Sequence, residues 1–352
     1  METPIAKSGP GKTSLILLIR RGPVTLGSGP ASFSTLSCPR RRSRCHNGGV
    51  GFIGRRSFLG GVAAIGVASR ARAGPAGGFP VAPSPQDFDV LDFTVEGDRV
   101  VGNRFVLCVP THLAKDEKVP LLVALHGSAE TSDARIGAYA FVERYGLGDA
   151  YARLRRPPVV RTLPKEDYFT DKLLAELNAS LVAQPFRGIA IACPYMPNAG
   201  RMDHEAKVLD AYASWIIDVV IPKARKEAPI YADASHTSID GVSLGGYTGI
   251  ETFLRKPDTF GAWGCVQGAL GSLRIVSYAE RLAAVHQQSH KDFHLETSLG
   301  DPYHDGTLTL SEALRRKGVA NELLVYPGPH DQTWLQESGT MGMLRWHDAR
   351  SR

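Results

Sequence analysis

The sequence predicts an α/β protein built on a doubly wound, mostly parallel β-sheet with an antiparallel hairpin at its N-terminal edge. Two observations carry this prediction. Short, continuous apolar runs, such as VPLLVAL at 119–125 and GIAIAC at 188–193, are typical of strands buried on both faces of a sheet. These runs alternate with longer segments whose apolar residues recur at helical spacing, which favours helices on both sides of the sheet.

The hairpin is predicted at the start of the folded part of the chain. The stretch 89–96 alternates apolar and polar residues, 100–109 is rich in β-branched residues, and Gly97-Asp98 provides the turn. The later strands are predicted at 119–125, 188–193, 237–242, 262–266, 292–298 and 321–326. The helices are predicted at 203–228, 244–255, 272–287, 307–317 and 334–347.

The connection at 131–184 is longer than the others. It contains a Pro-rich turn and a helix-like run, DKLLAELNASLVAQ. A connection of this length is often functional, for example as a lid or a substrate wall. An ordinary helix with a decorated loop is the other interpretation, and the sequence leaves both open.

The charge of the chain is unevenly distributed. Residues 1–73 hold twelve of the 41 Lys and Arg residues and one of the 35 Asp and Glu residues, a net charge of +11. The remaining 279 residues carry a net charge of −5. Binding to nucleic acid needs basic side chains gathered on the folded part of a protein, so this distribution argues against a nucleic-acid partner.

The basic segment ends in a pattern typical of an export signal. Arg55-Arg56 is followed by Ser-Phe-Leu, a weakly apolar stretch at 60–68 and the small-x-small pattern Ala71-Arg72-Ala73. This pattern resembles a twin-arginine translocation signal, an address that the export machinery reads. We therefore expect that machinery as a partner, and cleavage after Ala73.

The export signal divides the chain into three parts. Residues 1–73 are the leader, with a disordered stretch before the twin arginines; residues 74–86 are a Pro- and Gly-rich linker; residues 87–352 are the folded domain. No run of 18 or more apolar residues occurs, so we predict no stable membrane anchor. The mature protein is expected in the periplasm or outside the cell.

A candidate nucleophile lies between a predicted strand and a predicted helix. Residues 241–245 read GVSLG and fit the pattern G-x-S-x-G, which places Ser243 on a tight turn. Glycine is required at the two flanking positions for a steric reason, because side chains there would collide with neighbouring backbone. The pattern is short, so its strand–turn–helix context is what supports Ser243 as a nucleophile.

A serine hydroxyl needs a general base, and the base needs a carboxylate that orients it. In this architecture the order along the chain is serine, acid, histidine. Asp301 comes directly after the strand that ends at Gly300, and Asp305 is the alternative acid. His330, in a loop after the last strand, is the candidate base.

These segments together resemble the secreted serine esterases of the α/β-hydrolase superfamily. The matching segments are LLVALHGS, DGVSLGGY, TSLGDPY and VYPGPHD, and the resemblance covers about residues 89–347. It implies the α/β-hydrolase fold and a catalytic triad of Ser243, His330 and Asp301.

The same resemblance implies an oxyanion hole, which stabilises negative charge on the substrate oxygen. Its donors would be the backbone N–H groups of Leu244, next to the nucleophile, and of Ser128, in the loop His126-Gly127-Ser128. An HGGG run is absent, which favours the simpler kind of oxyanion loop with a single donor.

Four residues that follow predicted strands or the histidine loop are candidates for substrate binding: His126, Tyr195, Gln267 and Trp334. We predict no metal site. His286, His290 and His294 recur at four-residue intervals, but the helix is predicted to end near His290, and no HExxH motif occurs. No cofactor is expected.

The sequence therefore predicts an exported serine hydrolase that cleaves carboxylic esters, with a small-molecule or polysaccharide-linked ester as substrate. An acyltransferase or a peptidase on the same fold is the alternative, because the choice of acyl acceptor depends on the shape of the pocket. A non-catalytic binding protein on a hydrolase scaffold is a third, and it would require a missing or misplaced triad member.

Overall fold

The computed structural model describes residues 87–95, 97–98, 101–114, 116–162 and 168–351. The leader and linker lie outside these residues, so export stays a prediction. Within the described ranges, none of the helices combines the length and the apolar character that crossing a membrane requires.

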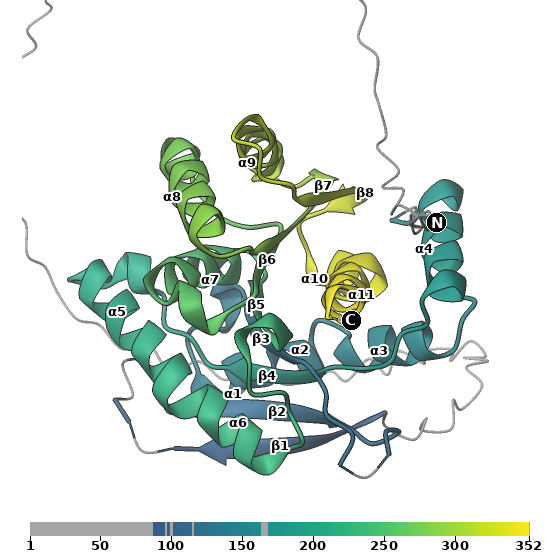
Figure 1. Ribbon diagram of the computed structural model, residues 1–352, viewed down its shortest axis with the longest axis horizontal. Coiled ribbons are helices and arrows are strands. Elements are labelled where there is room, and N and C mark those ends of the chain that lie inside the picture. The colour runs from purple at the N-terminus through teal and green to yellow at the C-terminus, as the bar shows by residue number, and fades with distance from the viewer. Residues whose placement is uncertain (1–86, 96, 99–100, 115, 163–167, 352) are drawn as a thin grey trace, which may run out of the picture. The chain divides into compact units, whose positions relative to one another are not determined.

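Eight strands form one sheet in the order β1-β2-β4-β3-β5-β6-β7-β8 (Figure 1). The strand β2 pairs antiparallel with both β1 and β4, and every other neighbouring pair is parallel. The predicted mostly parallel sheet with an N-terminal hairpin is therefore confirmed. The strands are β1 (Phe88–Thr94), β2 (Arg104–Pro110), β3 (Leu121–Leu125), β4 (Ala190–Pro194), β5 (Thr237–Gly241), β6 (Ala262–Val266), β7 (Asp292–Gly300) and β8 (Glu322–Pro329).

The central strands are buried on both faces. Every residue of β3, β4, β5 and β6 is buried, as the continuous apolar runs predict. Alternate residues of one strand enter different cores: Leu121 and Val123 of β3 pack into one cluster, whereas Leu122 packs into the other. The backbone at the carboxyl end of such a strand is consequently held in place by packing on both faces of the sheet.

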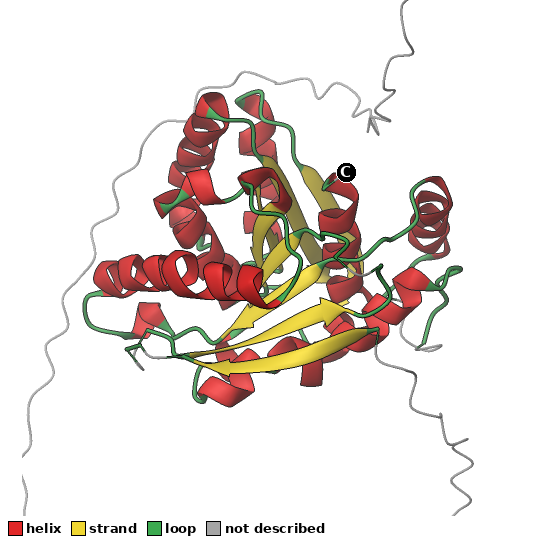
Figure 2. Ribbon diagram, turned by 60° about the horizontal axis from the view of Figure 1, so that its bottom comes forward, coloured by secondary structure: helices red, strands yellow, loops and turns green. Residues whose placement is uncertain are grey.

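Helices cover both faces of the sheet (Figure 2). One face carries α1 (Ala134–Ala138), α2 (Ala140–Glu143), α3 (Leu147–Arg155), α4 (Asp171–Ala183), α10 (Gln332–Trp334) and α11 (Thr340–Arg350). The other carries α5 (Glu205–Trp215), α6 (Ile221–Glu227), α7 (Leu244–Arg255), α8 (Ile275–Gln288) and α9 (His304–Arg316).

Two of the predicted helices contain a wider turn. A π-helical turn at Ile216–Val220 joins α5 to α6, and another at Leu335–Gly339 joins α10 to α11. The long connection 131–184 contains α1 to α4. In α3 four of nine residues are buried, including Tyr151, whereas α4 buries Leu181 alone. A lid function for this segment stays a prediction.

Candidate active site

Ser243 lies at the turn from β5 into α7 with a backbone conformation that is uncommon for a residue with a side chain, φ 54° and ψ −114°. The flanking glycines make the turn possible. A Cβ on Gly241 would lie 2.3 Å from the carbonyl carbon of Gly245, and one on Gly245 would lie 2.2 Å from Leu125 O. The G-x-S-x-G pattern therefore has here the steric origin that the sequence predicts.

His330 and Asp301 meet at the carboxyl ends of neighbouring strands. His330 directly follows β8, Asp301 directly follows β7, and His330 Nδ1 lies 2.9 Å from Asp301 Oδ1. The Asp301 side chain is fully buried, and that of His330 is 26% exposed. Asp305 is exposed in the first turn of α9. The structure thus brings Asp301, and not Asp305, to His330.

The carboxylate of Asp301 is held in place from several sides. Thr297 Oγ1 donates to its Oδ2 over 2.6 Å, and the Tyr303 N–H donates to its Oδ1 over 3.0 Å. Burial alone would raise the pKa of Asp301, but the hydrogen bonds from His330, Thr297 and Tyr303 lower it below its usual value. Asp301 therefore stays ionised and accepts the Nδ1 proton of His330, so that Nε2 keeps its lone pair.

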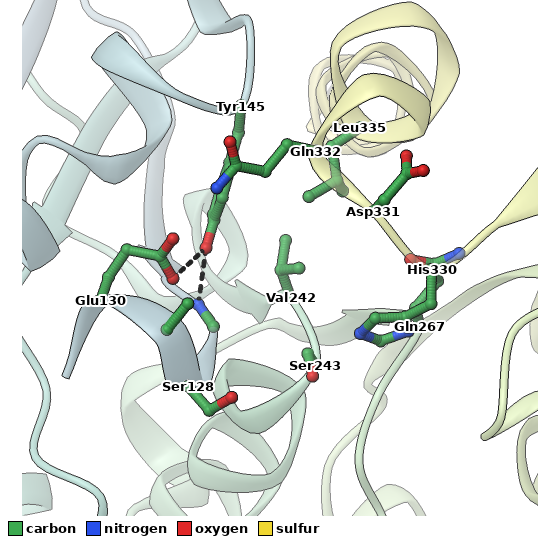
Figure 3. Close-up of a pocket in the computed structure, with 12 residues that line it drawn as sticks. Ser128, Glu130, Tyr145, Val242, Ser243, Gln267, His330, Asp331, Gln332 and Leu335 are labelled. Carbon is green, nitrogen blue, oxygen red and sulfur yellow. Dashed lines mark hydrogen bonds between the residues drawn. The ribbon is translucent and has the colours of Figure 1, made fainter.

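Ser243 and His330 line one cavity of about 180 Å³ (Figure 3). In the described structure no hydrogen bond joins the serine hydroxyl to the imidazole. Hydrogen bonds between a nucleophile and its base are often formed only when substrate is bound. The cavity is also lined by Ser128, and Leu244 begins α7 beside Ser243.

The two predicted oxyanion donors are each the first residue of a helical segment. Leu244 begins α7, and Ser128 begins the short 3₁₀ turn Ser128–Glu130. The first N–H groups of a helix have no partner within that helix, so both can donate to a ligand.

Of the four predicted substrate-binding residues, one lines the cavity and three do not. Gln267 lines the cavity, and its amide nitrogen donates to Ser298 Oγ over 2.7 Å and to Pro329 O over 2.9 Å, next to His330. The other three do not line this cavity, and their polar atoms bond to the protein itself. These bonds join His126 Nδ1 to Gly127 O (2.8 Å), Tyr195 Oη to Thr131 O (3.0 Å) and Trp334 Nε1 to Pro327 O (3.0 Å).

Sequence reasoning missed two buried residues of the cavity wall, Glu130 and Tyr145. Glu130 closes the 3₁₀ turn that begins at Ser128, and Tyr145 precedes α3. No spacing pattern relates them to the catalytic motifs. The one sequence signal for Glu130 is an acidic residue close behind the loop at 126–128.

A polar cluster lies beneath the nucleophile turn. Among the described residues, Asp240, His294 and His347 form the one group of potential metal-ligand atoms, all within 4.8 Å of one another. Both imidazoles contact the same oxygen, Asp240 Oδ2, at 3.1 and 2.9 Å. The predicted helix end near His290 is confirmed, since α8 ends at Gln288.

We expect the two candidate acids to respond differently to the same substitution. Asp301→Asn should lower kcat about 10³- to 10⁴-fold, because a neutral amide neither stabilises the imidazolium nor holds the required tautomer. The matched variant Asp305→Asn should stay within about threefold of wild type, because Asp305 is exposed and away from His330. Steady-state ester hydrolysis measures both, and a larger loss in Asp305→Asn would reverse the assignment.

The comparisons with known proteins agree on the fold. A scan against protein-family models and a search of curated proteins found no match. Among solved structures, a ferulic acid esterase is similar with a TM-score of 0.56 and 16% identity, over 75% of this chain and 99% of that chain. The fluorophosphonate-binding serine hydrolase F of Staphylococcus aureus gives 0.51 and 14%, over 75% and 99%. A ferulic acid esterase of the fungus Anaeromyces mucronatus gives 0.51 and 15%, over 77% and 94%. This chain has the α/β-hydrolase fold.

Proposed function

We propose that this protein is an exported serine hydrolase that cleaves carboxylic esters through an acyl-enzyme. One observation carries the proposal: the hydrogen bond between His330 and buried Asp301 faces the cavity that also contains Ser243 on its strained turn. The esterases and serine hydrolases among the structural neighbours support the same reaction class. The leader predicted at 1–73 supports export.

In the proposed reaction Ser243 Oγ attacks the ester carbonyl while His330 Nε2 takes the hydroxyl proton. Asp301 keeps the Nδ1 proton in place and stabilises the imidazolium. His330 then gives its proton to the leaving alcohol, and an acyl group remains on Ser243. Water, activated by the same imidazole, releases the acid.

Negative charge develops on the carbonyl oxygen in both steps. The N–H groups of Leu244 and Ser128 would donate to this oxygen, and the N-terminus of α7 adds a favourable dipole. Both donors are backbone groups, so neither depends on a side-chain rotamer.

The cavity favours a short acyl group. Its volume of about 180 Å³ is below the roughly 300–1,000 Å³ of pockets that enclose drug-sized ligands. The alcohol part of the ester, a small molecule or a sugar of a polysaccharide, would then extend toward solvent.

A panel of 4-nitrophenyl esters from acetate to octanoate, with a feruloylated sugar as a further substrate, tests this proposal. We expect the acetate and butyrate to be hydrolysed with the highest kcat/KM, and a fluorophosphonate probe to label a peptide that contains Ser243. Absence of both hydrolysis and labelling would refute the proposed function. Product analysis with an added alcohol or sugar separates hydrolysis from acyl transfer.

A further inference from the structure

The loop that presents the Ser128 N–H is held by side chains that the proposed reaction does not use. Figure 3 shows the Tyr145 phenol pointing toward the Glu130 carboxylate, beside the loop that carries Ser128. The Gly127 N–H donates to Tyr145 Oη over 3.0 Å, and the Tyr145 hydroxyl donates to Glu130 Oε2 over 2.6 Å. Tyr145 is 3% exposed and Glu130 is 1% exposed, so solvent does not compete for these bonds.

The protons in this chain of hydrogen bonds can be assigned. Burial and the adjacent Glu130 charge hold the pKa of Tyr145 well above its usual value, so the phenol stays protonated. A phenol has a single proton, and Tyr145 donates it in the hydrogen bond to the carboxylate of Glu130. Tyr145 Oη can therefore only accept from the Gly127 N–H, which fixes the direction of the bond.

The carbonyl of Gly127 is held from the other side. The Met196 N–H donates to His126 Nε2 over 2.9 Å, so the lone pair of the imidazole is on Nε2 and its proton is on Nδ1. That proton is donated to Gly127 O over 2.8 Å. Burial lowers the pKa of His126 to about 4, so the imidazole is neutral at pH 7 and this arrangement is stable.

The geometry of the peptide bond links the contacts of Gly127 to the orientation of the oxyanion donor, the Ser128 N–H. Gly127 C=O and Ser128 N–H belong to one planar trans peptide and point in opposite directions, so fixing the carbonyl also fixes the N–H. Tyr145 holds the preceding peptide through the Gly127 N–H. Space around Gly127 is tight: a Cβ there would lie 3.1 Å from Tyr145 Oη, 3.4 Å from Glu130 Oε2 and 3.9 Å from Ser243 Cβ.

We propose that Tyr145 and Glu130 are positioning residues for the oxyanion hole, which hold the backbone at Gly127 so that the Ser128 N–H points at the oxygen of the tetrahedral intermediate. In the described structure no hydrogen bond joins either side chain to Ser243 or His330. The inference rests on the proposed ester hydrolysis and adds that efficient hydrolysis requires Tyr145 and Glu130. A misaligned donor weakens binding of the transition state more than binding of the substrate.

The test is Tyr145→Phe, which removes the acceptor of the Gly127 N–H and keeps the ring packed against Phe141. We expect kcat to fall about 10- to 100-fold with KM within about threefold, because loss of a whole oxyanion donor costs about 10²- to 10³-fold. The inhibition constant of an aryl trifluoromethyl ketone, which forms an oxyanion on the enzyme, should rise by the same factor. Tyr139→Phe, which loses a 3.1 Å bond to Asp92 outside the cavity, is the matched control and should change neither value.

A pair of variants at Glu130 keeps the inference testable if Tyr145→Phe does not fold. The side-chain oxygen of Glu130→Gln still accepts from Tyr145, so kcat should stay within about threefold of wild type, whereas Glu130→Leu should lose about tenfold or more. Equal values in the two variants, or wild-type kinetics and inhibition in Tyr145→Phe, would overturn the inference while leaving the proposed hydrolase intact. An inactive wild type would refute the proposed function and this inference together.

Discussion

Ser243→Ala is expected to lower kcat for ester hydrolysis by about 10⁴-fold or more and to abolish labelling by a fluorophosphonate. The substitution removes the one oxygen that can form the acyl-enzyme, and the remaining groups supply only binding and oxyanion stabilisation. The fold should be preserved, because alanine and serine meet the same backbone strain at φ 54° and no side-chain cap hydrogen bond is lost from α7.

The control for this variant is Ser235→Ala. Ser235 precedes β5, at the strand end opposite Ser243, and its exposed hydroxyl contacts Asp233. We expect its kcat/KM to equal that of wild type. If Ser243→Ala retained a tenth of the wild-type kcat, another residue would have to be the nucleophile, and the assignment of His330 as its base would lose its basis.

The sequence predicts those parts of the site that are specified by consecutive residues or by the order of the elements along the chain. The turn at Ser243 is specified by five consecutive residues, since a Cβ on Gly241 or on Gly245 would lie within 2.3 Å of a backbone atom. Asp301 and His330 are 29 residues apart, but the order of elements in a parallel sheet brings the ends of β7 and β8 together. The topology of the sheet thus places two residues that are distant in sequence next to each other.

The parts that sequence does not predict depend on side-chain packing across the domain. Tyr145 contacts Gly127 across 18 residues that include α1 and α2, and no spacing rule connects the two. In the sequence His294 resembles an ordinary strand residue, yet it contacts Asp240, which is 54 residues away along the chain. His347 contacts the same carboxylate from 107 residues away. Whether such groups pair or point to solvent is decided by which faces the helices cover.

The second large effect is expected in that buried cluster. The side chains of Asp240, His294 and Glu296 are fully buried, with His294 Nδ1 3.1 Å from Asp240 Oδ2 and His294 Nε2 3.4 Å from Glu296 Oε2. Burial alone would lower the pKa of His294, but hydrogen bonds and the two carboxylates raise it to about 10. His294 is therefore a cation in the folded protein, beside the ionised carboxylate of Asp240 and beside Glu296, whose pKa burial raises to about 7.

We expect His294→Leu to lower the free energy of unfolding at pH 7 by about 3–5 kcal/mol, because it leaves the carboxylate of Asp240 without its buried counter-charge. Urea unfolding monitored by circular dichroism measures this change. The matched control is His290→Leu, whose side chain is 76% exposed and pairs with Asp292 at the surface, and it should stay within about 0.5 kcal/mol.

The same cluster should make stability depend on pH in a defined direction. A histidine whose pKa rises from 6.5 to about 10 on folding binds more protons in the folded than in the unfolded state between those values. Its stabilisation is therefore complete below pH 6.5 and is lost as the pH rises toward 10. Wild type should lose stability over this range more steeply than His294→Leu. Parallel pH profiles would show that folding does not raise the pKa of His294, and would refute the buried ion pair between His294 and Asp240.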